Sequence, residues 1–107
     1  MYDLSGETTI PELITIMENS KCVVATDSGS AHIAGAVAKN IISIHGPTNF
    51  YQSAPYSTKY NNVKVATLNL KCSPCYDTEV IKNCKNNICM QDLNAETVMG
   101  LMAELSL

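Results

Sequence analysis

The sequence predicts an α/β fold in which a parallel β-sheet is flanked by helices. Helical and strand-like patterns alternate along the chain, and this alternation is typical of parallel sheets with crossover helices. The segments 22–26 and 41–45 are mostly apolar on both faces, as expected of strands that are covered on both sides. With 107 residues, the chain is one domain or a piece of one, so 1–107 is predicted to form a single unit.

A helix is predicted near each end of the chain. Thr9 and Glu12 fit a capping box at the start of the first helix, and Asn94 is the expected N-cap of the last helix. The apolar stripe of the first helix would consist of Ile10, Leu13, Ile14 and Met17. The corresponding stripe of the last helix would consist of Val98, Leu101, Met102 and Leu105. Both helices are interpreted as cover for the sheet, without a chemical role.

Each of the two predicted strands ends in a small, polar, glycine-containing segment. The strand at 22–26 runs into Asp27-Ser28-Gly29, and the strand at 41–45 runs into Gly46-Pro47-Thr48. The fourteen residues between Thr26 and Ile41 leave room for one crossover helix. Because parallel strands point the same way, both segments should emerge at the carboxyl edge of the sheet, where open α/β sheets bind ligands.

The crossover helix should present its N-terminus at this edge. Small residues at i, i+3, i+4 and i+7 would let it pack closely on the sheet: Ala31, Ala34, Gly35 and Ala38. Ser28 or Ser30 could cap it, and its first N–H groups form an anion site best suited to phosphate. His32, in the first turn, could donate a hydrogen bond to a phosphate oxygen. The alternatives are an ordinary surface histidine and a plain Gly-Pro turn, and His45 is interpreted as structural.

Charge and hydropathy exclude several classes of protein. The net charge is −3, with seven lysines and no arginine, so the basic stripe of a nucleic-acid-binding protein is missing. No apolar run approaches the length of a membrane span, and the first residues do not resemble a signal peptide. No nucleic-acid partner and no secretion are therefore expected.

A cysteine-rich loop is predicted at about residues 70–91. Its four thiols, at a spacing that a closed zinc site could use, are Cys72, Cys75, Cys84 and Cys89. Structural zinc and free thiols both fit this pattern, and disulfides are less expected without a secretion signal. Cys22 lies in a predicted strand and is interpreted as a small core residue.

These segments together resemble the carboxyl-terminal, donor-nucleotide-binding domain of the heptosyltransferase family, glycosyltransferase family 9. The resemblance rests on Asp-Ser-Gly-Ser-Ala-His at 27–32, the small-residue helix, the following apolar strand and Gly-Pro-Thr at 46–48. Asp-Leu-Ser-Gly at 3–6, Ala-Pro-Tyr at 54–56 and the cysteine pattern extend it over nearly the whole chain. It implies part of a Rossmann-like domain from the carboxyl-terminal half of a GT-B enzyme.

The resemblance also implies an activity for the whole enzyme and a ligand for each of its halves. The family transfers heptose from ADP-heptose to lipopolysaccharide core with inversion, needs no cofactor for catalysis, and acts in the cytoplasm, at the inner face of the bacterial inner membrane. Carried over to this sequence, the residues that hold the nucleotide diphosphate would be Asp27, Ser28, Gly29, His32, Gly46, Pro47 and Thr48. The catalytic base and the acceptor site would lie in the other half, so no catalytic residue is assigned here and the chain alone should not turn over.

Two further expectations stay open at this stage. An alternative to the nucleotide-binding role is a non-catalytic α/β interaction module stapled by zinc. An exposed edge of the incomplete sheet would also favour self-association. A flavodoxin-like site is disfavoured, because the first loop lacks the longer Ser/Thr-rich phosphate segment.

Overall fold

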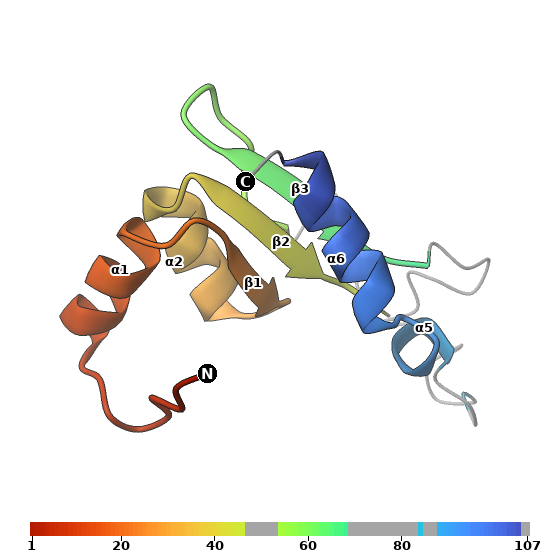
Figure 1. The fold of residues 1–107 in the computed structure, drawn as a ribbon, viewed down its shortest axis with the longest axis horizontal. Helices are drawn as coiled ribbons and strands as arrows, with labels where there is room; N and C mark the ends of the chain where they lie inside the picture. The colour runs from red at the N-terminus through yellow and green to blue at the C-terminus, as the bar shows by residue number, and fades with distance from the viewer. Residues whose placement is uncertain (47–53, 69–83, 85–87, 106–107) are drawn as a thin grey trace.

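The computed structural model describes residues 1–46, 54–68, 84 and 88–105 (Figure 1). Its strands and helices, in chain order, are α1 (Ile10–Glu18), β1 (Val23–Thr26), α2 (Gly29–Val37), β2 (Asn40–Ile44), β3 (Asn62–Ala66), α5 (Ile88–Gln91) and α6 (Ala95–Glu104). Pairing is parallel throughout the three-stranded sheet, whose order is β1-β2-β3. The predicted fold class, a partial Rossmann-like parallel sheet with flanking helices, is therefore confirmed.

The sheet is buried at its centre and open at β1. In β2, Ile41, Ile42 and Ser43 have no exposed surface. In β1, residues alternate between half-buried and exposed, and Val24 is 44% exposed. The expectation that β1 is covered on both faces is thus wrong, since α6 contacts β3 and β2 and leaves this face of β1 open.

One face of the sheet packs on α2, with α1 outside it. Val23, Ile41 and Val63 are register partners on this face. They surround a core that also includes Met17 of α1 and the small residues of α2. Ala31, Ala34 and Ala38 are at most 4% exposed, which confirms that alanine side chains of low volume bring this helix close to the sheet. The prediction is wrong for Gly35, the other position of this stripe, which lies against Pro55.

The helix α1 begins with the predicted capping box. The Thr9 N–H donates to Glu12 Oε1 at 3.0 Å, and the Glu12 N–H donates to Thr9 Oγ1 at 3.3 Å. The predicted stripe holds for Leu13 and Met17, which pack on the core. It is wrong for Ile10, the first residue of the helix, which is 66% exposed because the contact with the core is made further along.

The opposite face of the sheet carries α6. Asn94 caps this helix as predicted, accepting a hydrogen bond from the Thr97 N–H at 3.0 Å. The predicted apolar face is half-buried at each of its positions, and Lys64 Nζ of β3 lies 3.7 Å from Glu104 Oε2. This helix covers Ile42, which alternates along β2 with the residues that face α2.

The described part of the cysteine-rich segment contains a short helix where a loop was expected. This helix, α5, lies beyond the arrowheads of the strands in Figure 1. Cys72 and Cys75 fall outside the described residues, as do Pro47 and Thr48. None of the helices in the described ranges is both long and apolar enough to cross a membrane.

Candidate functional site at the carboxyl edge of the sheet

The predicted loops lie at one edge of the sheet. Thr26 and Ile44 are register partners at the ends of β1 and β2, so Asp27 and His45 follow paired residues and leave the sheet side by side. The segment Asp27–Ser28 leads into α2, and His45–Gly46 ends the described part of the next connection. The structure therefore places Asp27, Ser28, Gly29 and Gly46 at the same edge of the sheet, as predicted.

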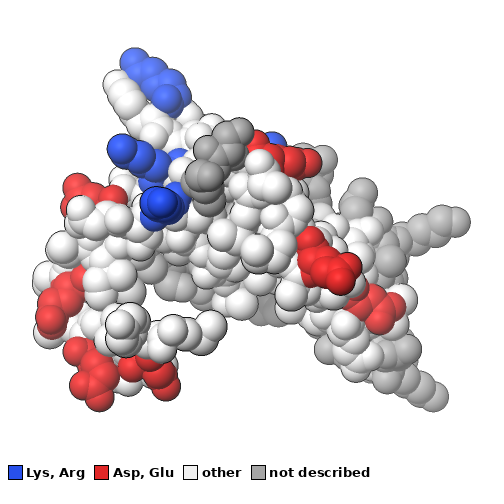
Figure 2. Space-filling model, in the orientation of Figure 1, with Lys and Arg blue, Asp and Glu red and all other residues white. Residues whose placement is uncertain are grey.

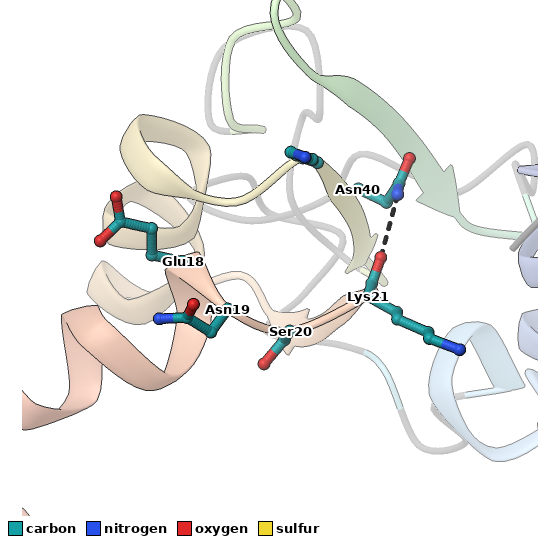
Figure 3. A pocket seen from close by; sticks show the side chains of 6 residues that line it. Glu18, Asn19, Ser20, Lys21 and Asn40 are labelled. Carbon is teal, nitrogen blue, oxygen red and sulfur yellow. Dashed lines mark hydrogen bonds between the residues drawn. The ribbon is translucent and has the colours of Figure 1, made fainter.

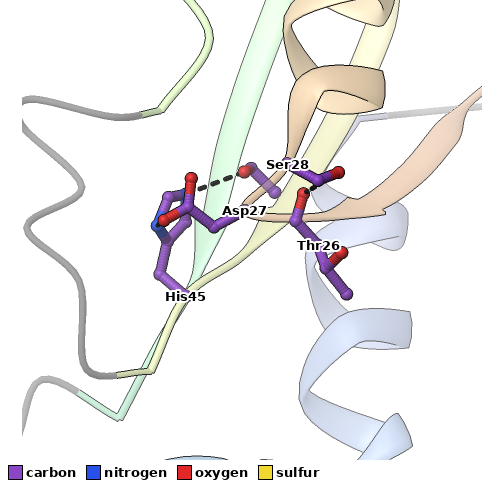
Figure 4. Close-up of polar contacts among 5 residues, drawn as sticks. Thr26, Asp27, Ser28 and His45 are labelled. Carbon is purple, nitrogen blue, oxygen red and sulfur yellow. Dashed lines mark hydrogen bonds and ion pairs between the residues drawn. The ribbon is translucent and has the colours of Figure 1, made fainter. Parts of the chain in front are cut away.

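Ser28 is the N-cap residue of α2, but its side chain does not cap the helix. Its hydroxyl makes no hydrogen bond to the N–H groups of the first turn. Instead Ser28 Oγ donates to the Thr26 carbonyl at 3.3 Å and lies 2.8 Å from Ser30 Oγ. The prediction of Ser28 as a side-chain cap is wrong because the hydroxyl turns back toward the strand (Figure 4). The positive end of the helix dipole is therefore not closed by this side chain.

Gly29, the first residue of α2, has no structural need to be glycine. It is exposed, and its φ does not lie in the left-handed region; among the described glycines only Gly6 has a positive φ. A Cβ built on it meets no atom within 4 Å. Glycine leaves room for a close approach of another group to the backbone, and this space lies directly over the start of the helix.

Behind the loop lies a buried polar group that the sequence analysis did not identify as functional. His45 and Ser43 are at most 1% exposed, and His45 Nε2 lies 2.8 Å from Ser43 Oγ. On the other side of the ring, His45 Nδ1 lies 3.7 Å from Asp27 Oδ2, and Figure 4 shows this carboxylate turned toward the imidazole. The available signal was the spacing: Ser43 and His45, two residues apart in an apolar strand, must share one face.

The electrostatics of His45 follow from its position. Burial lowers the pKa of His45 below its ordinary value; the Asp27 carboxylate acts in the opposite direction, and the charge of His32 lowers it further. The ring is thus neutral near pH 7. His32 itself is exposed in the first turn of α2, where it is near enough to His45 to act on its pKa.

Gly46 closes this edge against α5. A Cβ on Gly46 would lie 2.8 Å from Met90 Cγ and 3.3 Å from Cys89 Sγ, so a larger residue here would have to displace the Met90 side chain, whereas a Cβ on Gly29 would meet open space. Cys89 is buried and Cys84 is exposed, both as free thiols. Within the described ranges no three potential metal ligands come together. The zinc prediction depends on Cys72 and Cys75, which lie outside those ranges.

A separate polar pocket of about 430 Å³ lies at the amino edge of the sheet (Figure 3). Its lining comprises Glu18, Asn19, Ser20, Lys21, Lys39 and Asn40. The Asn40 side-chain amide donates to the Lys21 carbonyl at 2.9 Å and so joins the starts of the two strands. Figure 2 shows blue lysine side chains at the upper end of the visible face, with acidic side chains beside them. Because this pocket is at the opposite edge from the two loops, we assign it a structural role.

Comparison with known proteins gives the family context of this site. The sequence model of glycosyltransferase family 9 (heptosyltransferase) matches residues 1–86. Lipooligosaccharide heptosyltransferase 2 of Campylobacter jejuni is 33% identical over 97% of the chain and 32% of its own length. The lipopolysaccharide core heptosyltransferase OpsX of Haemophilus influenzae is 27% identical over 98% of the chain and 31% of its own length. Lipopolysaccharide heptosyltransferase 2 of Escherichia coli is 28% identical over 61% of the chain.

The chain therefore spans about a third of the length of the first two of these relatives. No solved structure matches it. The family match extends over most of the sequence and includes both loops at the carboxyl edge. On this evidence the chain belongs to glycosyltransferase family 9, the heptosyltransferase family.

Proposed function

We propose that this chain is the donor-nucleotide-binding part of an inverting glycosyltransferase. The first turn of α2, with Ser28, Gly29 and His32, would hold the diphosphate of a nucleotide sugar, and the connection after β2 would line the same site. Relatives named lipooligosaccharide or lipopolysaccharide heptosyltransferases support a donor of the ADP-heptose type and a lipopolysaccharide-type acceptor. The chain would then be part of the carboxyl-terminal half of a GT-B enzyme, with the acceptor bound by the part of such an enzyme that the chain does not span.

The observation that carries this proposal is the open space at Gly29. A residue that neither conformation nor packing requires to be glycine stands at the positive end of a nine-residue helix. A diphosphate oxygen could approach the backbone N–H groups there, as anions do at helix N-termini. The adjacent serine hydroxyls could donate further hydrogen bonds, and protonated His32 could add a positive charge.

These groups would also serve the chemistry of glycosyl transfer. When the acceptor hydroxyl attacks the anomeric carbon, the bond to the nucleotide diphosphate breaks and negative charge grows on the leaving phosphate. Donors fixed by the fold stabilise such charge without reorganising during the reaction. The transition state would carry oxocarbenium character, as in glycoside chemistry generally.

Isothermal titration of the chain with ADP tests the proposal. We expect binding that is weakened about tenfold by Ser28→Ala or His32→Ala, the loss typical of one hydrogen bond to a charged group. Gly29→Ala should also weaken binding, because its Cβ occupies the approach to the backbone. Gly100→Ala in α6 is the matched control, since a Cβ there also meets nothing within 4 Å, and it should bind ADP like the wild type.

The result also separates this function from the zinc-stapled interaction module. A chain that is folded by circular dichroism but shows no heat of ADP binding would contradict the proposal and favour the module. Binding that survives all three substitutions at the α2 N-terminus would place the nucleotide elsewhere.

A further inference from the structure

The buried side chains of Ser43 and His45 lie behind the segment that leads into α2. Their role, as inferred below, concerns the orientation of Asp27 and rests on the proposed diphosphate site. Asp27 is the only acidic residue in the segment from the end of β1 through α2. Its side chain is 22% exposed and immediately precedes the first turn of the helix. A carboxylate free to rotate toward that turn would occupy the positive end of the helix and repel a phosphate.

We propose that Ser43 and His45 hold the Asp27 carboxylate turned toward the sheet, so that the first turn of α2 can receive an anion. The three side chains come from the central strand and from the end of its neighbour. They form one line: Ser43 Oγ, His45 Nε2 at 2.8 Å, and His45 Nδ1 with Asp27 Oδ2 at 3.7 Å. His45 is thus a positioning residue for the donor site and not a catalytic one.

The arrangement fixes the tautomer of the ring. An Nδ1 lone pair directed at the Asp27 carboxylate would be repelled by it, whereas an Nδ1–H group is attracted. The proton of neutral His45 therefore lies on Nδ1, and Nε2 accepts a hydrogen bond from the Ser43 hydroxyl. Ser43 cannot act as a nucleophile here, because it is completely buried.

The position of the group explains why two polar residues occur in the most deeply buried strand. Ser43 and His45 lie on the face of β2 that packs on α2, next to the apolar side chains of the core. Buried polar groups persist where they are hydrogen-bonded and where they specify one arrangement. Here the arrangement specified is that of the loop leading into α2.

A pair of substitutions at His45 separates the two nitrogen positions of the ring. In His45→Asn the amide nitrogen is placed near Nδ1 and its N–H group can still face the Asp27 carboxylate, whereas in His45→Gln it is placed near Nε2 and faces Ser43. We expect His45→Gln to weaken ADP binding several-fold, since the N–H dipole that attracts the Asp27 carboxylate is lost. His45→Asn should rescue binding to within about twofold of the wild type.

Thermal unfolding of the same samples distinguishes positioning from stability alone. Both variants lose one buried contact, so both melting temperatures should fall. A purely structural role would leave the two variants with equal ADP affinity once folded, and that outcome would overturn the proposal. If the wild type itself fails to bind ADP, the proposed function fails, and with it the claim that His45 serves a diphosphate.

Nitrogen-15 NMR of the histidine rings in the wild type provides a readout that needs no variant to fold. The spectrum should show His45 as a neutral ring protonated on Nδ1. A ring protonated on Nε2 would overturn the proposal directly, even if ADP binds, because Ser43 would then be the acceptor and the side of the ring facing Asp27 would carry no proton.

Discussion

Gly35 of α2 lies directly against Pro55, so that a Cβ on the glycine would come within 2.9 Å of the proline Cβ. The same turn of the helix is held by Asn61, whose side-chain amide donates to the Gly35 carbonyl at 3.0 Å and to the Tyr56 carbonyl at 3.3 Å. These contacts fix the segment 54–61 against α2.

Gly35→Ala and Gly100→Ala should therefore change stability in opposite directions. At Gly35 the added methyl group meets a rigid ring, and overpacking of this kind costs about 1–3 kcal/mol. At Gly100, inside α6, it meets nothing within 4 Å, so the better helix propensity of alanine should stabilise by up to about 1 kcal/mol. Urea denaturation of both variants measures the difference. A Gly35→Ala variant as stable as Gly100→Ala would show that Pro55 does not pack on α2 as described.

Stability should fall as the pH drops below about 6.5, the ordinary pKa of histidine. Burial lowers the pKa of His45 in the folded protein, and Asp27 and His32 act on it in opposite directions. Below this pH the unfolded chain therefore binds a proton that the folded chain does not. The contribution of neutral His45 to the free energy of unfolding is complete above about pH 6.5 and is lost as the pH falls below it. Urea denaturation at pH 7.5 and pH 5.5 measures the effect, and His45→Gln should flatten the dependence. An unchanged slope in this variant would assign the effect to another group.

The cysteines should differ in their rate of alkylation. Burial raises the pKa of the Cys22 thiol, and the thiolate is the reactive form, whereas Cys84 is exposed. With a chelator present, iodoacetamide at pH 8 should modify Cys84 several-fold faster than Cys22, as peptide mass spectrometry can follow.

Omitting the chelator extends this experiment to the predicted zinc site. Stoichiometric zinc, together with protection of Cys84 and Cys89 until the chelator is added, would support a site with Cys72 and Cys75. Equal rates with and without chelator would favour free thiols.

The outer edge of β1 should support self-association at high concentration. In the described ranges β1 pairs only with β2, and Val24 is 44% exposed. Unpaired strand edges associate with one another, and a lysine on such an edge opposes this. We expect concentration-dependent dimers by sedimentation and a shift to monomer in Val24→Lys. Ile16→Lys, at a residue of α1 that is 40% exposed, is the control and should not change the association. A wild type that is monomeric at every concentration would remove the prediction.

The sequence was sufficient for those features that depend on neighbouring residues. Thr9 and Glu12 cap α1, and Asn94 caps α6, because their bonds join residues three apart. The alanines of α2 are buried because their spacing places them on one face of the helix. The meeting of the Asp27 and Gly46 loops follows from parallel pairing, which the alternating pattern predicted.

Only the tertiary structure determined the contacts between side chains that are distant along the chain. The sequence could not show that α6 leaves Val24 open, that the Ser28 hydroxyl turns back to its strand instead of capping α2, or that Asp27 faces His45. Each of these depends on which of several nearly equivalent partners lies closest after packing. Local propensity sets which conformations a segment can adopt, whereas the position of neighbouring elements selects among them, and only the folded chain contains that information.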